Sequence, residues 1–226
     1  MKTLTAQDYA RAARHLGCEE AAIRAVVAVE SSGPGFLSDG RCKILFEGHI
    51  FYRETMGRYA QTHPTLCFEK WTREHYARGQ TADERGAGEI ARLGIAMLID
   101  RLAALRWARY GKFQIMGFNH QLCMYPNVRF FYQAMQCDEA SHLDAFCHLI
   151  KSMCLAGALR RLEWAVFAHG YKGSAYREND YDVKLARAYK LFREICANGD
   201  TALWPRPARP IAESIGYASA KPLSGN

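Results

Sequence analysis

The sequence lacks an apolar run long enough to cross a membrane. A spanning helix needs roughly 20 predominantly apolar residues, and no stretch of this 226-residue chain approaches that length. The N-terminus also lacks the uninterrupted apolar core of a signal peptide, because Asp8, Arg11 and Arg14 fall within it. We therefore expect a protein with no membrane span that is made in the cytoplasm without a signal peptide.

Motifs for metal binding and redox chemistry are also missing. None of the eight cysteines belongs to a Cys-x-x-Cys pair, and the eight histidines show no metal-ligand spacing. These absences argue against a zinc ribbon or a thioredoxin-like site, so we expect no metal and no cofactor. Cys147 and Cys154 fall on one helical face with apolar neighbours, which favours reduced core thiols; a disulfide framework is the alternative.

Acidic residues are the scarcer charged class. Thirty Lys and Arg against 23 Asp and Glu give a net charge of +7, which favours an anionic partner: nucleic acid, a membrane surface or an acidic cell-wall polymer. A nucleic-acid binder would cluster its basic residues on one face, whereas no run of Lys and Arg here exceeds two residues. The charge pattern therefore disfavours nucleic acid.

The remaining pattern is mostly helical. Capping boxes at Thr5 and Thr81 and the apolar periodicity predict helices over 5–16, 19–30, 47–59, about 81–105, 127–135, 138–153, 159–168 and 182–197. One β-hairpin is expected around Asp39-Gly40 in "GFLSDGRCKILFE". We predict a mainly α fold with a small β-hairpin (α+β), monomeric, as a single domain over residues 1–203. A proline-rich tail, 204–226, follows.

A carboxylate stands on the apolar face of the second predicted helix. Ile23, Val26, Val27 and Glu30 are spaced i, i+3, i+4 and i+7, and the helix breaks immediately after Glu30. Removal from water favours the protonated form of a carboxyl group, and glycosidic cleavage needs such a proton donor for the leaving oxygen. The alternative is a glutamate at a helix end that points into solvent.

Two further stretches carry side chains suited to sugars. "YGKFQIMGFNH", residues 110–120, contains Gln114 and Asn119, and "HGYKGSAYREND", residues 169–180, contains Tyr171. Tyrosine and amide side chains combine an apolar body with a polar tip, which matches the faces and hydroxyls of sugars. Each stretch alone is more typical of packing near a turn, but together with Glu30 they indicate a carbohydrate site.

This combination resembles the lysozyme and lytic-transglycosylase superfamily, and most closely the N-acetylmuramidase domain of phage endolysins. The resemblance rests on Glu30-Ser31 after an aliphatic helix, on Gly-x-x-Gln-Ile-Met and on a Tyr-x-Gly turn, and runs from about Ile23 to Tyr189. It implies a lysozyme-like fold with a groove beside the hairpin, and cleavage of the β-1,4 bond after N-acetylmuramic acid in peptidoglycan. Glu30 matches the catalytic acid, with Ser31, Gln114, Asn119 and Tyr171 as substrate-binding residues. It also implies synthesis in a host cytoplasm and action on the wall after release.

The chain departs from the family pattern at two places. Tyr110-Gly111 stands where the family usually has Trp-Gly, and Tyr171-Lys172-Gly173 stands where the superfamily usually has Tyr-Asn-Gly. Unlike asparagine, a lysine at this position cannot accept a hydrogen bond.

A second carboxylate, Glu47, follows the second predicted strand. It is expected to face Glu30 across the groove and to act as base, water-holder or nucleophile. The alternative is a structural carboxylate that caps the next helix, with His49 packed beside it. Asp39 is interpreted as a turn residue, and His49, His120 and His169 as packing or surface groups.

Two other functions remain open. A lytic transglycosylase also needs one acid but closes a 1,6-anhydro ring, and a non-catalytic module could bind anionic wall polymer through the net charge. The expected partners are peptidoglycan glycan strands and anionic envelope polymers. The tail could contribute through Arg206, Arg209 and Lys221, which only Glu213 opposes.

Overall fold

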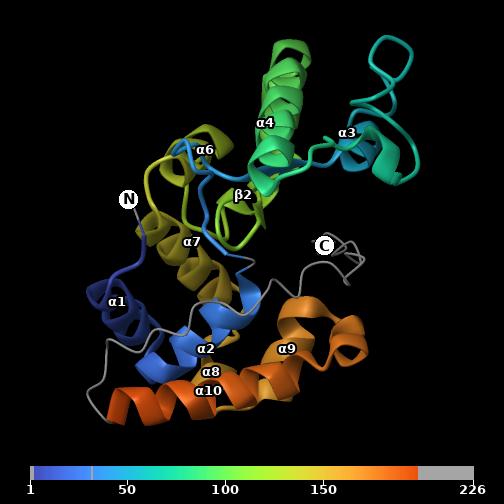
Figure 1. Ribbon diagram of the computed structural model, residues 1–226. Coiled ribbons are helices and arrows are strands. Elements are labelled where there is room, and N and C mark those ends of the chain that lie inside the picture. Colours follow the sequence, from blue (N-terminus) through green and yellow to red (C-terminus); the bar gives the residue numbers. More distant parts are fainter. Residues whose placement is uncertain (1–2, 32, 198–226) are drawn as a thin grey trace. The chain divides into compact units, whose positions relative to one another are not determined.

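The computed structural model describes residues 3–31 and 33–197, and these form two compact units (Figure 1). Pro34–Leu149 makes up one, which we call the sheet unit; Leu4–Gly33 and the described residues 150–197 make up the other, which we call the helical unit. The predicted tail, 204–226, lies outside the described residues. The predicted fold class, mainly α with a small β component, is confirmed, although the β component is a three-stranded sheet and not the single hairpin expected.

In the helical unit, helices pack around an alanine-rich cluster. The unit contains α1 (Ala6–Leu16), α2 (Glu20–Glu30), α8 (Ala156–Arg160), α9 (Trp164–Lys172), the 3-10 helix η3 (Ser174–Asn179) and α10 (Tyr181–Ala197). Ala21, Ala22 and Ala25 of α2 pack with Tyr189 and Phe192 of α10. Small side chains on one helix leave room for aromatic rings on the other, so α10 lies alongside α2 (Figure 1).

The sheet unit places helices around three short strands. Its strands are β1 (Ile44–Phe46), β2 (Ala108–Tyr110) and β3 (Ile115–Met116), in the antiparallel order β1-β2-β3. Its helices are α3 (Gly48–Glu54), η1 (Arg73–His75), α4 (Ala82–Ile99), α5 (Arg101–Arg106), η2 (Gly117–His120), α6 (Val128–Met135) and most of α7 (Glu139–Ser152). Phe46 and Tyr110, both with 0% of their surface exposed, anchor the sheet in the core of this unit.

The hairpin predicted around Asp39-Gly40 forms only in part. Gly40 has φ +83° and donates to the Leu37 carbonyl, and the arms share one antiparallel bridge, Phe36 to Cys42, with backbone bonds on either side of it. The second arm continues into β1, which pairs with β2 and not with the first arm. A second hairpin, which was not predicted, joins β2 and β3, where Gly111 at φ +67° turns the chain.

Several helix boundaries also differ from the prediction. The helix predicted over 81–105 divides at Asp100, whose extended backbone ends α4 and whose carboxylate accepts from the Ala103 N–H to begin α5. The helix predicted over 47–59 ends at Glu54, and the one predicted over 159–168 is replaced by α8 and α9.

The thiols divide into buried and exposed sets. All eight cysteines lie in the described part of the chain, and none forms a disulfide there. Burial raises the pKa of the Cys42 and Cys123 thiols to about 12, which suppresses the reactive thiolate. Cys137, Cys154 and Cys196 are exposed.

We expect a thiol reagent to react quickly with only these three exposed cysteines in the native protein, because thiolate formation and access limit the others. After unfolding without reductant, all eight thiols should titrate. Four or fewer thiols after unfolding would show that disulfides form and that the reduced-thiol interpretation is wrong.

Candidate active site

The carboxylate of Glu30 ends α2. Ser31 adopts an extended backbone, φ −87° and ψ 122°, and its N–H donates to the Val27 carbonyl at 3.0 Å, so the helix stops there. Only 3% of the Glu30 side chain is exposed. The helical periodicity predicted that the Glu30 side chain lies on the apolar face of its helix, and the structure buries this side chain.

Two donors from different helices bind the two oxygens of this carboxylate. Lys172 Nζ, at the end of α9, lies 2.9 Å from Glu30 Oε2, and the Tyr181 hydroxyl, at the start of α10, donates to Oε1. Burial, together with the negative charge of Glu30, raises the pKa of Tyr181 well above its usual value. The hydroxyl therefore keeps its proton and acts as a donor at any physiological pH.

Aromatic rings surround the Lys172 ammonium. Its Nζ lies 5.0 Å from the ring centroid of Tyr171 and 5.3 Å from that of Tyr181, both within the range of a cation–π interaction. Tyr171 stacks on Phe167 with ring centroids 5.9 Å apart. The segment predicted to be a turn is therefore helical. Tyr171 and Lys172 lie in the last turn of α9, and η3 follows.

Sequence reasoning missed Tyr181 and the ion pair of Lys172. The last helix was predicted to begin at residue 182, whereas α10 begins at Tyr181, directly after Asp180 at φ +48°. The one feature of the sequence that could have indicated this ion pair is Lys172, a basic residue where the related pattern has asparagine.

Glu47 lies in the sheet unit and is held by residues from three directions. Its Oε1 accepts from Arg109 Nε of β2 at 2.6 Å, its Oε2 accepts from the Tyr76 hydroxyl at 2.5 Å, and His49 Nδ1 lies 3.6 Å from Oε2. Its side chain is 5% exposed. Glu47 occupies the N-cap position of α3, but its side chain makes no capping hydrogen bond.

The pKa values of His49 and Tyr76, two neighbours of Glu47, are shifted. Burial lowers the pKa of His49, and the nearby charge of Glu47 only partly offsets this. Burial and Glu47 both raise the pKa of Tyr76 far above its usual value. Tyr76 therefore donates to Glu47, and the cluster consists of one carboxylate, one guanidinium and neutral partners.

Gln114 and Asn119 lie near the β2–β3 turn. Gln114 has φ +49°, and its side-chain amide donates to the Gly111 carbonyl at 2.8 Å, which braces the turn. Asn119 is half-buried in η2, where its backbone carbonyl accepts from the Cys123 N–H. A Cβ at Gly111 would come within 2.6 Å of the His142 ring, so glycine is required for two reasons.

The six predicted site residues thus divide equally between the two units. Glu30, Ser31 and Tyr171 belong to the helical unit, whereas Glu47, Gln114 and Asn119 belong to the sheet unit. Asp39 is a turn residue, as interpreted: Arg41 Nε lies 2.8 Å from its carboxylate, and this guanidinium holds the pKa of Asp39 below its usual value.

Neither metal ligation nor a membrane span has a candidate among the described residues. No group of three or more His, Cys, Asp or Glu side chains in residues 3–31 and 33–197 is arranged to hold a metal ion. Across the same residues, no helix has the length and apolar character needed to cross a membrane.

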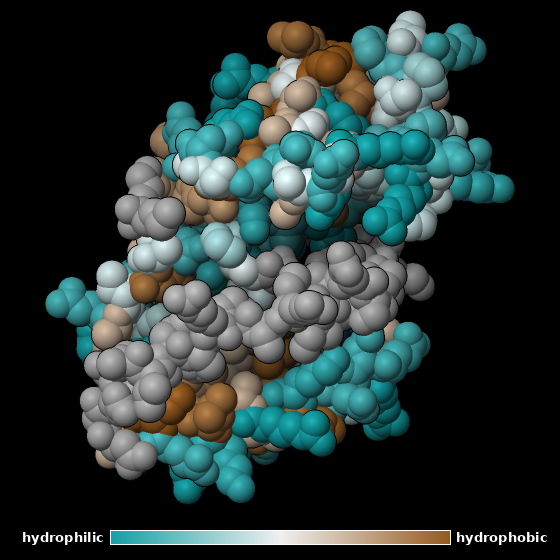
Figure 2. Space-filling view, viewed as in Figure 1, coloured by the Kyte–Doolittle hydropathy of each residue, from teal (hydrophilic) through white to brown (hydrophobic). Residues whose placement is uncertain are grey.

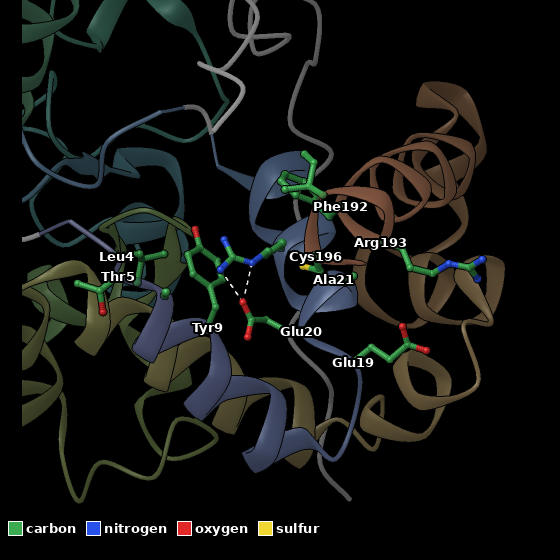
Figure 3. Close-up of a pocket in the computed structure, with 12 residues that line it drawn as sticks. Leu4, Thr5, Tyr9, Glu19, Glu20, Ala21, Phe192, Arg193 and Cys196 are labelled. Carbon is green, nitrogen blue, oxygen red and sulfur yellow. Dashed lines mark hydrogen bonds and ion pairs between the residues drawn. The ribbon is translucent and has the colours of Figure 1, made fainter. Parts of the chain in front are cut away.

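The helical unit also contains a cavity of about 540 Å³ lined by α1, α2 and α10 (Figure 3). Within it, Glu20 accepts from Arg24, whose guanidinium lies 4.3 Å from the Tyr9 ring centroid. None of the predicted site residues lines this cavity, so it is separate from Glu30.

Comparison with known proteins identifies the family of the chain. The family model for N-acetylmuramidase matches residues 19–193, most of the chain. The crystal structure of Burkholderia AP3 phage endolysin is similar, with 42% sequence identity and a TM-score of 0.74, over 85% of this chain and 73% of that one. No curated protein matches. The chain therefore belongs to the N-acetylmuramidase family of peptidoglycan-cleaving enzymes.

Proposed function

We propose that this protein hydrolyses the β-1,4 glycosidic bond between N-acetylmuramic acid and N-acetylglucosamine in peptidoglycan, with Glu30 as the general acid. The observation that carries the proposal is a carboxyl group at the end of α2 whose side chain is only 3% exposed. Glu30 gives its proton to the glycosidic oxygen as the bond from that oxygen to C1 of the muramic acid breaks. Water then adds at C1 and leaves a hydroxyl group there, and its other proton passes to Glu47 in an inverting mechanism or back to Glu30 in a retaining one.

Glu47 is the proposed second carboxylate. An inverting mechanism would use it to activate water, and a retaining mechanism would use it as the nucleophile. Its hydrogen bonds from Arg109 and Tyr76 hold both of its oxygens in place. We propose Ser31, Gln114, Asn119 and Tyr171 as the residues that hold the sugar, through their hydroxyl and amide groups.

A zymogram on purified peptidoglycan tests the proposal directly. The protein should clear a zone, and borohydride reduction of the products should convert N-acetylmuramic acid ends, and not N-acetylglucosamine ends, to the alcohol. No clearing would favour the non-catalytic binding module. Clearing without reducible ends would favour the lytic transglycosylase.

Charge is proposed to bring the enzyme to the wall after its release from the cell. Peptidoglycan and its associated envelope polymers carry carboxylates and phosphates, and the chain has a net charge of +7. The face in Figure 2 is largely hydrophilic. Such attraction acts over a Debye length of about 8 Å at physiological salt.

We expect lysis of whole envelopes to fall steeply from low to moderate salt, because salt screens attraction between exposed charges. Cleavage of a short soluble glycan should change little over the same range, since a short glycan carries little of the negative charge of the whole envelope. Equal salt dependence on both substrates would contradict recruitment by charge. Removal of residues 206–226, which lie outside the described residues, would show whether that segment contributes.

A further inference from the structure

We infer that Lys172 is a positioning residue for Glu30: it holds the carboxylate in an ion pair before substrate binds and turns away as Glu30 takes up the proton used in catalysis. The inference rests on the proposed role of Glu30 as general acid. It goes beyond that role because it assigns a function to a residue at which the chain departs from the related Tyr-Asn-Gly pattern.

In this ion pair the Glu30 side chain is buried and the Lys172 side chain is exposed to solvent. The Glu30 side chain is 3% exposed and the Lys172 side chain 38% exposed, with 2.9 Å between Nζ and Oε2. A carboxylate with so little contact with water depends on its protein partners for stabilisation. The lysine, in contrast, has a flexible stem that can carry its ammonium into solvent.

The donor bound to the other oxygen of Glu30 is neutral. From α10, the Tyr181 hydroxyl donates to Oε1, and from α9 the Tyr171 ring lies close to both Lys172 and Tyr181. α1 also packs on α2, where its Tyr9 ring lies against Arg24, six residues before Glu30, and Arg24 pairs with Glu20. Lys172 is the cation bonded directly to the Glu30 carboxylate.

Proton uptake by Glu30 removes the negative charge on which this ion pair depends. An ammonium group has three donors and no acceptor, so it cannot accept from the hydroxyl of a protonated carboxyl group and keeps only an uncharged bond to the carbonyl oxygen. Its positive charge also favours the ionised form of a carboxylate at this distance. Lys172 therefore opposes proton uptake, and its departure favours proton uptake.

The test is the pH dependence of kcat/KM on a short soluble glycan, for the wild type, Lys172→Met and Lys172→Arg. Methionine keeps the length of the stem without the charge, so the acid should stay protonated to higher pH. The ratio of Lys172→Met to wild-type kcat/KM should rise about tenfold from about pH 5 to about pH 8. Lys172→Arg keeps the charge and should follow the wild-type profile.

Lys190→Met is the matched control for loss of one positive charge. Lys190 is exposed on α10 and belongs to the same unit, so its removal should leave the shape of the pH profile unchanged. If Lys172→Met does not fold, Lys172→Gln removes the same charge with a polar side chain. Parallel profiles for wild type and the neutral variants would overturn the inference.

Glu30→Gln in the same assay separates this inference from the proposed function. A folded Glu30→Gln protein with near-normal activity would reject Glu30 as the acid, and the inference with it. An inactive Glu30→Gln protein combined with parallel pH profiles would reject only the role of Lys172.

Discussion

Glu30→Gln should reduce peptidoglycan cleavage by about 10²–10⁴-fold, the usual contribution of a general acid. Glutamine keeps the shape of the side chain: its one amide oxygen can accept from Lys172, and its NH2 group can donate to the Tyr181 hydroxyl oxygen. It has no acidic proton, so the leaving glycosidic oxygen departs without protonation. The rate of release of soluble muropeptides, measured at equal concentrations of folded protein, checks this expectation.

Glu19→Gln is the matched control for Glu30→Gln. Glu19 lies at the opposite end of α2 and accepts from the hydroxyl of Tyr189 at 2.8 Å, so it too joins α2 to a tyrosine of α10. Its replacement should leave the rate within about twofold of the wild type, because no proton transfer is assigned to it. Equal losses in both variants would mean that α2–α10 packing, and not acid catalysis, explains the effect.

Glu47→Gln should lower the free energy of unfolding by about 3–5 kcal/mol, the typical effect of removing one partner from a buried ion pair. Arg109 loses its Glu47 counter-charge while its own side chain is only 15% exposed. The Tyr76 hydroxyl also loses a charged acceptor. Denaturant unfolding of wild type and variant measures the difference.

Glu89→Gln separates the structural role of Glu47 from a catalytic one. Glu89 is a second buried carboxylate of the sheet unit, which binds Arg92 and the backbone N–H groups of Phe46 and Ala77. Both variants should be destabilised, but only Glu47→Gln should also slow cleavage per folded molecule. Equal rates for the two folded variants would restrict Glu47 to a structural role, and unchanged stability of Glu47→Gln would contradict the ion-pair argument.

Local signals in the sequence were sufficient to predict most helices but not the sheet. The capping boxes at Thr5 and Thr81 lie where α1 and α4 begin, because a cap depends only on residues a few positions apart. Pairing of β1 with β2 depends instead on residues such as Ile44 and Tyr110, which are distant in the chain. The turn at Asp39-Gly40 was therefore recognised, and its strand partner was not.

The site was predictable where helical periodicity determined it. Glu30 follows from the apolar face of one helix, whereas its bonds to Lys172 and Tyr181 join residues 142 and 151 positions away. Likewise, Glu47 was predicted from its place after a strand, but the Arg109 and Tyr76 contacts that bury it come from elsewhere in the sheet unit. Spacing along the chain carries no information about such partners.

Mass spectrometry of the muropeptides released in heavy-oxygen water tests the proposed mechanism most directly. Hydrolysis places one oxygen atom from water on C1 of N-acetylmuramic acid, so the products should have reducing muramic acid ends that carry one heavy oxygen. Glu30→Gln should release almost none of them. Unlabelled products ending in 1,6-anhydromuramic acid would contradict hydrolysis and establish ring closure instead.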